Sequence, residues 1–586
     1  MRKIIVLFIA CVFGVFFGMT QVYGANMPLE IMNLKPAGTG TPVLTASHRY
    51  FFAYPGIEYK IRAQVVGGDY PYTYELINEP AGMSIDSAGY IRWENPTSDA
   101  NNITISVTDS SGTEVSSFWS IDVTNDVFRF VDINAAPGGD GTIENPFDSI
   151  EAMTENVLST DIVYFRKGTY AVPVRGDHTI NSASAFKWDY PRNTSVQWIA
   201  YPDENVTMDL GGDKYFYNRV AGQPFYFDGL RFYRGREYFF RSGSALTYVT
   251  FLDNTFEDLT LERENYNSNQ GTYFTMYGGR GYNMAWQGNT FSGFRGTQGI
   301  GSLYDQDTTL IEDNYFTDFS GYAGSTNQVF AFKIGIVNLT LRGNVVNLGM
   351  DDDFSIFGGT SLNSGFVDGD GVHGPRSQNI EILYNYFRHD GSCMGQLNRG
   401  HQADTWVHRN TFVSTFQMTN LVEGSCDGPF IINDNIFQNS DAGIRYHYTC
   451  SGDYLGCVSQ EGNIGAVNGL VDEDGLLLES SDIGQLGWQF SDGTTPRDLG
   501  GDVQPISVPE PVIIRADVNQ DKSIDLVDAR MIFRNILGFP MSGTDWQDSS
   551  TSGDVNCDGR VDLRDAMLTF RESVGLSMSG TAWCVQ

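Results

Sequence analysis

The chain has 586 residues and a formal net charge of −34, from 71 Asp and Glu against 37 Lys and Arg. This length exceeds what one compact core usually holds, so several domains or an elongated repeat domain are expected. The acidic excess argues against nucleic acid or an anionic membrane surface as a partner.

The N-terminal segment has the pattern of a secretory signal. Arg2 and Lys3 precede an apolar run over residues 4–17, and small residues follow near Gly24. We therefore predict a signal peptide over residues 1–24 and a secreted protein, extracellular or associated with a cell surface. The apolar run is too short for a membrane span, and no later stretch suggests one.

Residues 27–125 alternate apolar and polar side chains in short stretches separated by turns, most clearly at 72–76 and 103–107. This pattern predicts a small β-sandwich. The stretches 71–74, 80–86 and 89–93 resemble the immunoglobulin-like, cadherin-like modules of bacterial surface proteins. The resemblance implies a spacer or a binding module.

Residues 128–501 are predicted to form the main body. Residues 130–132 precede Gly138, Gly139 and Gly141, and the segments 161–170 and 198–212 each join a β-like run to a turn. These segments resemble the opening of pectate-lyase-like proteins. The resemblance implies a mainly β fold, a right-handed parallel β-helix, and says little about the substrate.

An internal repeat supports the solenoid independently. The pattern Asn-x-Phe, or a close relative, recurs most often every 25 residues, with insertions, at Asn254, Asn289, Asn314, Asn344, Asn385, Asn410 and Asn435. Such a period is typical of stacked coils that bury one face against the next. We predict a hydrogen-bonded asparagine ladder and a buried row of phenylalanines, both with structural roles.

A Pro-containing linker over 502–514 precedes two calcium-loop repeats in residues 515–586. Residues, most of them with oxygen-bearing side chains, recur at the spacing that wraps one hard cation. The predicted ligands of the first loop are Asp517, Asn519, Asp521, Ser523, Asp525 and Asp528. Those of the second loop are Asp554, Asn556, Asp558, Arg560, Asp562 and Asp565, offset by 37 residues.

Asp at the last loop position, the duplication and the missing entering helix resemble type I dockerins, and the two small helices expected after the loops form an α-helical C-terminal domain. The resemblance implies two bound Ca²⁺ ions and a cohesin-like protein partner. Two features depart from the pattern. Lys522 replaces the usual turn glycine, which implies weaker binding in the first loop. The pairs 526–527 and 563–564 lack the hydroxyl groups that many dockerins present, which leaves the partner open.

A row of cationic, aromatic and titratable residues lies 11 to 13 positions before six of the seven repeat asparagines. It comprises Arg241, Tyr277, Lys333, His373, Arg399 and Glu423, and His447 extends it by one coil. Residues at the same position in successive coils of a solenoid lie on the same face, so the row predicts a groove for an acidic polysaccharide. Arg241, Tyr277 and His447, with His401 and Asp404 from a nearby dense patch, are predicted to bind substrate.

Three functions fit these residues. A lyase would use Lys333 or Arg399 as base, His373 as acid or base, and Arg376 against the substrate carboxylate, with a further Ca²⁺ near Asp351, Asp353 or Asp370. A glycoside hydrolase would instead use two carboxylates among Asp368, Asp370, Asp404 and Glu423. A non-catalytic carbohydrate-binding or adhesive surface protein is the third reading. The leading hypothesis is a lyase that acts on a uronate-containing polysaccharide. It rests on analogy with the fold and on the common position of the row residues relative to the repeat asparagines.

Overall fold

The computed structural model describes most of residues 27–465 and parts of the C-terminal domain. The described residues are 27–34, 47–158, 160–173, 196–218, 224–242, 246–259, 272–276, 281–295, 298–303, 306–320, 328–332, 336–347, 360–363, 377–388, 396–398, 402–412, 417–419, 430–433, 435–437, 445–447, 458–461, 464–465, 516, 518, 524, 526–536, 553, 555–556, 560–573 and 581.

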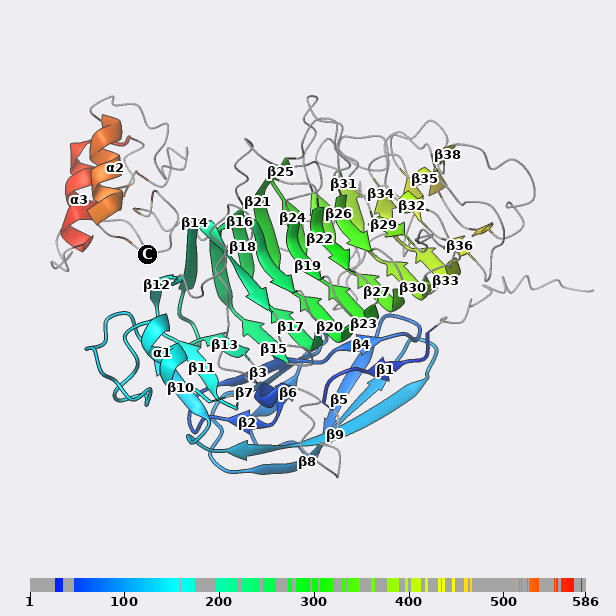
Figure 1. The fold of residues 1–586 in the computed structure, drawn as a ribbon, viewed down its shortest axis with the longest axis horizontal. Coiled ribbons are helices and arrows are strands. Elements are labelled where there is room, and N and C mark those ends of the chain that lie inside the picture. Colours follow the sequence, from blue (N-terminus) through cyan, green and yellow to red (C-terminus); the bar gives the residue numbers. More distant parts are fainter. Residues whose placement is uncertain are drawn as a thin grey trace, which may run out of the picture.

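Residues 27–34 and 47–123, here called the N-terminal module, fold as a small β-sandwich (Figure 1). Its elements are β1 (Glu30–Ile31), η1 (His48–Tyr50), β2 (Phe52–Ala53), β3 (Tyr59–Arg62), β4 (Val65–Val66), β5 (Thr73–Ile77), β6 (Met83–Ile85), β7 (Tyr90–Trp93), β8 (Ala100–Thr108) and β9 (Glu114–Val123). They form sheets in the orders β2-β9-β8-β5, β3-β7-β6 and β1-β4. The antiparallel pair β5 and β8 contains both predicted strands. Ile61, Ile105 and Trp119 are buried between the sheets.

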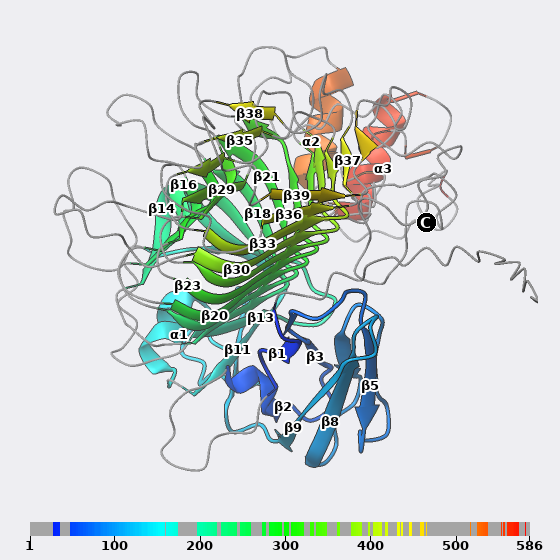
Figure 2. The same cartoon turned by 90° about the vertical axis from the view of Figure 1, so that its right-hand side faces the viewer.

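The main body consists of long parallel sheets stacked coil on coil, which confirms the predicted parallel β-helix (Figures 1 and 2). One sheet has 12 strands. They are β10 (Phe128–Val131), β11 (Ile162–Phe165), β13 (Val196–Ala200), β15 (Phe225–Asp228), β17 (Thr247–Leu252), β20 (Gly281–Gln287), β23 (Gln306–Glu312), β27 (Val337–Arg342), β30 (Ser377–Leu383), β33 (Gln402–His408), β36 (Phe430–Asn433) and β39 (Val458–Glu461).

The second parallel sheet has 17 strands, because two strands of most coils join it. They are β12 (Gly168–Ala171), β14 (Val206–Asn218), β16 (Leu230–Ser242), β18 (Thr255–Leu259), β19 (Thr272–Met276), β21 (Thr290–Arg295), β22 (Gln298–Leu303), β24 (Tyr315–Thr317), β25 (Phe319–Ser320), β26 (Gln328–Phe332), β28 (Val345–Asn347), β29 (Thr360–Asn363), β31 (Tyr386–Arg388), β32 (Gln396–Asn398), β34 (Thr411–Phe412), β37 (Ile436–Phe437) and β40 (Ile464–Gly465). A separate parallel pair joins β35 (Gln417–Thr419) to β38 (Arg445–His447).

Aromatic rows fill the space between the sheets. The predicted phenylalanine row is in register, and Phe232, Phe256, Phe291 and Phe316 stack with ring centroids 4.5 to 5.0 Å apart. The spacing of parallel strands holds one ring over the next, so a single residue type per coil builds a continuous core.

The predicted asparagine ladder is confirmed. Its members are completely or almost completely buried at the corner between the two sheets. The Nδ2 of Asn289 donates to Oδ1 of Asn314 at 2.9 Å, and the same bond recurs from Asn254 through Asn410. Each amide also donates to a backbone carbonyl, as Asn314 does to Trp286 at 2.9 Å. These bonds satisfy polar groups that would otherwise be costly to bury.

Each described residue that directly precedes a ladder asparagine makes the corner in the left-handed backbone region. Asp253, Gly288, Asp313 and Gly343 have φ between 54° and 67°. A Cβ at Gly288 would lie 2.4 Å from Oδ1 of Asp253, and one at Gly343 would lie 2.3 Å from Oδ1 of Asp313. Glycine is therefore required wherever the preceding coil places an aspartate at this corner.

Helix α1 (Ile150–Asn156) was not predicted from the sequence. The hydroxyl of Ser149 accepts the Ala152 N–H as an N-cap, and Ile150 and Met153 pack into the core that continues through the β-helix. The helix thereby covers apolar side chains at the start of the solenoid.

The C-terminal domain contains α2 (Leu526–Ile536) and α3 (Leu563–Ser573), one after each predicted calcium loop. Val518, Ile532 and Ala566 belong to one buried cluster, so the two repeats share a small core.

Candidate functional site

One face of the solenoid is closed to substrate. The outward side chains of the 12-stranded sheet near its start, such as Phe130, Tyr164, Tyr226 and Leu252, belong to the same buried cluster as the core of the N-terminal module. Figures 1 and 2 show the module along this sheet. From β10 to β30 a polysaccharide cannot reach this face, so the groove expected from the sequence has to lie elsewhere.

The strands that precede the predicted groove residues are neighbours in the 17-stranded sheet. The end of β16 pairs with β19, and β22, β26, β29 and β32 follow in order. Strand β19 ends at Met276, β26 at Phe332 and β32 at Asn398, immediately before Tyr277, Lys333 and Arg399. In this register Met276 and Phe332 are equivalent to Leu397 and not to Asn398. The strands before Tyr277 and Lys333 therefore end in phase, whereas β32 ends one residue later, before Arg399.

The register corrects part of the predicted row. Arg241, half-buried in β16, pairs with Thr275, so it is two positions out of phase with Tyr277. His447 pairs with Thr419 in the separate sheet of β35 and β38. Counting back from the ladder asparagine misaligned Arg241 because the connections between strands differ in length from coil to coil.

Asp404 lies in a different sheet from Arg241. Its strand, β33, belongs to the 12-stranded sheet, where the register makes Asp404 equivalent to Asn379. Asn379 and Asn338 form a second ladder, in which Asn379 donates to Asn338 at 2.8 Å and Asn338 donates to Asp307 at 3.0 Å. The role of Asp404 remains a prediction.

Most predicted site residues lie outside the described part of the chain. These are Tyr277, Lys333, Asp351, Asp353, Asp368, Asp370, His373, Arg376, Arg399, His401 and Glu423. Their roles remain predictions.

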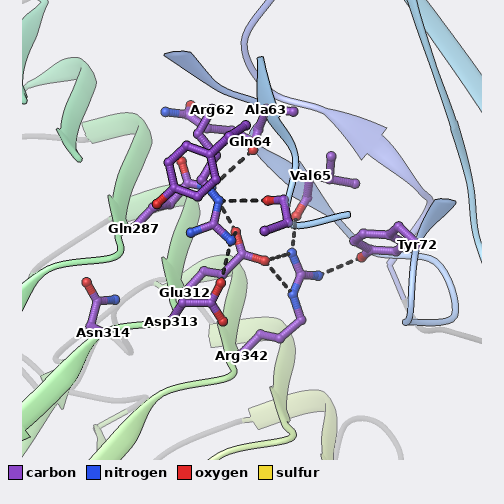
Figure 3. A network of polar contacts seen from close by, with 12 residues as sticks. Arg62, Ala63, Gln64, Val65, Tyr72, Gln287, Glu312, Asp313, Asn314 and Arg342 are labelled. Atoms are coloured by element: carbon purple, nitrogen blue, oxygen red, sulfur yellow. Dashed lines mark hydrogen bonds and ion pairs between the residues drawn. The ribbon is translucent and has the colours of Figure 1, made fainter. Parts of the chain in front are cut away.

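A dense ionic cluster that the sequence did not indicate joins the N-terminal module to the 12-stranded sheet (Figure 3). Glu312 accepts from Nε of Arg342 at 2.9 Å and from Gln287 at 2.8 Å, and it lies 3.6 Å from Arg62. Arg62 also pairs with Asp313. These side chains are at most 9% exposed.

The charges of this cluster compensate one another. Burial alone would raise the pKa of Glu312, but the guanidinium groups of Arg342 and Arg62 outweigh burial and hold the pKa below its usual range. Glu381, one coil beyond Arg342, lacks such close compensation, and burial raises its pKa to about 7. Perturbed acids often mark catalytic sites, but the module covers these groups, so they act in docking.

The calcium loops are described only in part. Asp528 and Asp565, at the last ligand position of each loop, are fully buried. Oδ1 of Asp528 accepts the backbone N–H of Val518, and Oδ1 of Asp565 accepts that of Val555, both at 2.9 Å and both from the second residue of the same loop. Asp565 also accepts the Asp562 N–H at 2.7 Å, yet burial keeps its pKa raised. A buried carboxylate that closes its loop suits the last ligand position of a calcium loop. Within the described residues no three acidic, His or Cys side chains form a cluster, and most predicted ligands lie outside them.

Comparison with known families identifies the two end domains. Residues 515–571 match the dockerin type I domain, and residues 40–124 match the model described as "Putative Ig domain". The chain thus carries a type I dockerin at its C-terminal end, a domain class that generally binds calcium and a cohesin, and an Ig-like domain at its N-terminal end. A comparison with curated proteins gives no match.

Solved structures similar to this chain include a rhamnogalacturonan lyase, at 14% identity over 64% of this chain and 98% of that chain, with a TM-score of 0.35. A pectate lyase, Pel9A, has 11% identity over 64% and 88%, with a TM-score of 0.26. The catalytic domain of a GH87 alpha-1,3-glucanase has 12% identity over 75% and 99%, with a TM-score of 0.22. At these scores the likenesses carry no argument about activity.

None of the helices in the described residues is both long and apolar enough to span a membrane.

Proposed function

We propose that the protein is a secreted polysaccharide-degrading enzyme, a lyase that acts on a uronate-containing chain and joins a complex or surface through its dockerin. The observation that supports the proposal is that β19 and β26, the strands that directly precede Tyr277 and Lys333, end at equivalent positions of the sheet that the module leaves free. An acidic polysaccharide matches a groove that is lined by cations and aromatic rings.

The reaction would be a β-elimination. Lys333 or Arg399 takes the proton from the carbon next to the uronate carboxylate, and Arg376 stabilises the negative charge that develops there. The electron pair of that C–H bond forms a carbon–carbon double bond as the glycosidic C–O bond breaks. The leaving oxygen receives a proton from His373, acting as acid.

The test exposes the full-length, calcium-loaded protein to a panel of uronate polysaccharides and follows the ultraviolet absorbance of the conjugated double bond. We expect a rise that Lys333→Ala and Arg399→Ala abolish. Arg92→Ala is the matched control, because this cation pairs with Glu58 on the N-terminal module, and it should leave the rise intact.

Two outcomes would replace this proposal. New reducing ends without ultraviolet absorbance would identify a glycoside hydrolase that uses carboxylates such as Asp370 and Glu423. Binding without any cleavage would identify a carbohydrate-binding or adhesive protein.

The dockerin is proposed to bind two Ca²⁺ ions, with a third ion in the β-helix near Asp351 and Asp353. For the cohesin, α3 offers an exposed apolar row in which Leu563, Met567 and Phe570 are 50% to 65% exposed. Their spacing puts them on one side of the helix. Because 563–564 lack the hydroxyl groups of many dockerins, we propose that this apolar row contributes most of the contact.

The partner test is a pull-down with a panel of cohesins in calcium. Met567→Asp is expected to abolish capture. Arg530→Asp is the matched control, since Arg530 occupies the equivalent exposed position of α2. Equal capture of both variants and the parent would exclude the α3 row.

A further inference from the structure

The outer face of the 12-stranded sheet is an interaction surface, and we propose that its partner is the chain's own N-terminal module, permanently docked as a brace across successive coils rather than tethered as a mobile spacer. The partner is defined by charge, by shape and by the length of the contact.

Charge complementarity runs along β3. Lys60 and Arg62 alternate in this strand and point to the same side. Lys60 Nζ lies 3.0 Å from Oδ1 of Asp228 and 2.9 Å from Oδ2 of Asp253, while Arg62 meets Glu312 and Asp313 two coils further along. The module thus supplies cations and the β-helix supplies carboxylates, with the Arg62 contacts buried and the Lys60–Asp253 pair partly exposed.

The corner between the sheets is built to receive these cations. Asp253 and Asp313 alternate with Gly288 and Gly343 in successive coils, and each aspartate extends over the glycine of the next coil. Asp253 accepts a hydrogen bond from Tyr90 Oη at 2.6 Å and another from Lys60 Nζ. A side chain at either glycine would collide with the aspartate. The aspartates therefore recur at every second coil, and Lys60 and Arg62, which alternate along β3, each pair with one of them.

The contact spans many coils. At one end Ser47 Oγ donates to Gln197 at 2.6 Å, and the backbone N–H of Arg49 donates to the same oxygen at 2.7 Å. In the middle Gln64 donates to Thr250 at 2.9 Å.

At the other end Arg342 donates to Tyr72 Oη at 2.7 Å, and Tyr384 donates to the Tyr70 carbonyl at 3.3 Å. Tyr70 and Tyr384 also pack ring against ring, with centroids 4.9 Å apart. Coils from β13 to β30 are therefore held by one rigid body.

Domains joined by a small polar interface move relative to one another, whereas this interface combines a continuous apolar cluster with the buried ion pairs of Arg62. Undocking would expose Phe130, Tyr164 and Leu252 and would leave Asp228 and Lys60 without their partners. Each consequence opposes separation.

The experiment cuts the covalent connection in the otherwise intact chain. A recognition sequence for a site-specific protease is inserted between Asn125 and Asp126, which are exposed between β9 and β10. After complete cleavage at neutral pH, the module and the β-helix are expected to elute together on size exclusion, in equal amounts. Separate elution of the two fragments would overturn the proposal.

A second arm tests the charged contacts. Lys60→Met and Arg62→Met together, in the cleavable chain, are expected to release the module, measured as a separate low-mass peak. The matched control is Arg92→Met, which removes an exposed pair with Glu58 on the same module and should leave the fragments together. If the double variant does not fold, the cleaved parent protein still decides the outcome. If the double variant folds and stays docked, the charges do not hold the module.

Discussion

The Glu381→Gln substitution is expected to make the stability of the β-helix less dependent on pH. Glu381 lies in β30, is 4% exposed and accepts a hydrogen bond from the Met27 backbone of the N-terminal module. Burial raises its pKa to about 7, although Arg342 acts in the opposite direction. The native protein therefore holds a carboxyl group that titrates near neutral pH at the docking interface.

The sign and size of the effect follow from linkage. In the unfolded chain the pKa is near the ordinary value of 4.5. Because the native pKa is higher, the stability that this group contributes is fully present below pH 4.5 and is lost as pH rises through about 7. At about 1.36 kcal/mol for each pKa step of one, the loss amounts to about 3 kcal/mol.

Urea unfolding, followed by tryptophan fluorescence across this pH range, measures the difference in unfolding free energy between the two proteins. The free energy of unfolding of the Gln variant is expected to increase relative to that of the parent protein as pH rises. Glu312→Gln is the comparison of opposite sign: Arg342 and Arg62 lower the pKa of Glu312, so that variant is expected to lose stability at neutral pH and to lose less as pH falls. A difference between Glu381→Gln and the parent that does not change with pH would refute the reasoning.

Three further outcomes are expected. Arg62→Met lowers the free energy of unfolding by about 3–5 kcal/mol, because it takes the paired cation from buried Asp313 and one of two cations from buried Glu312, whereas Arg92→Met, at an exposed pair, costs under about 1 kcal/mol. Equal losses in urea unfolding would contradict the buried cluster. Asn314→Ala interrupts the ladder and leaves buried amide and carbonyl groups unsatisfied, at a cost of about 1–3 kcal/mol for each, and an unchanged melting temperature would argue against the ladder's role. Removing calcium with a chelator unfolds the dockerin while the β-helix stays folded; helix signals in circular dichroism that persist without calcium would contradict this.

The β-helix could be predicted because its stabilising contacts recur at one position in every coil. Asn289 hydrogen-bonds to Asn314, and Phe291 stacks on Phe316. The recurring Asn-x-Phe pattern therefore predicts both interactions. The dockerin repeats could be recognised for the same reason, since each loop carries its ligands within a short stretch. Helix α1 has a weaker signal, although Ser149 before the spacing of Ile150 and Met153 could have revealed it.

The docking contacts could not be predicted, because nothing local distinguishes their residues. Lys60 and Asp253 are 193 residues apart and read as ordinary surface charges. The groove row was only partly predictable. Arg241 and Thr275 share a register position but lie at different distances from their ladder asparagines, so phase counting failed once the connections changed in length.

The long contact of the N-terminal module has a consequence for the order in which the chain acquires its structure. Ribosomes complete the module first, yet Tyr72 has to wait for Arg342, 270 residues later, and Tyr70 for Tyr384, 314 residues later. Contacts between such distant positions close late and slow folding. Until β30 is made, the module presents Lys60 and Arg62 along a strand whose partners are synthesised one coil at a time, as a template on which the growing solenoid can align.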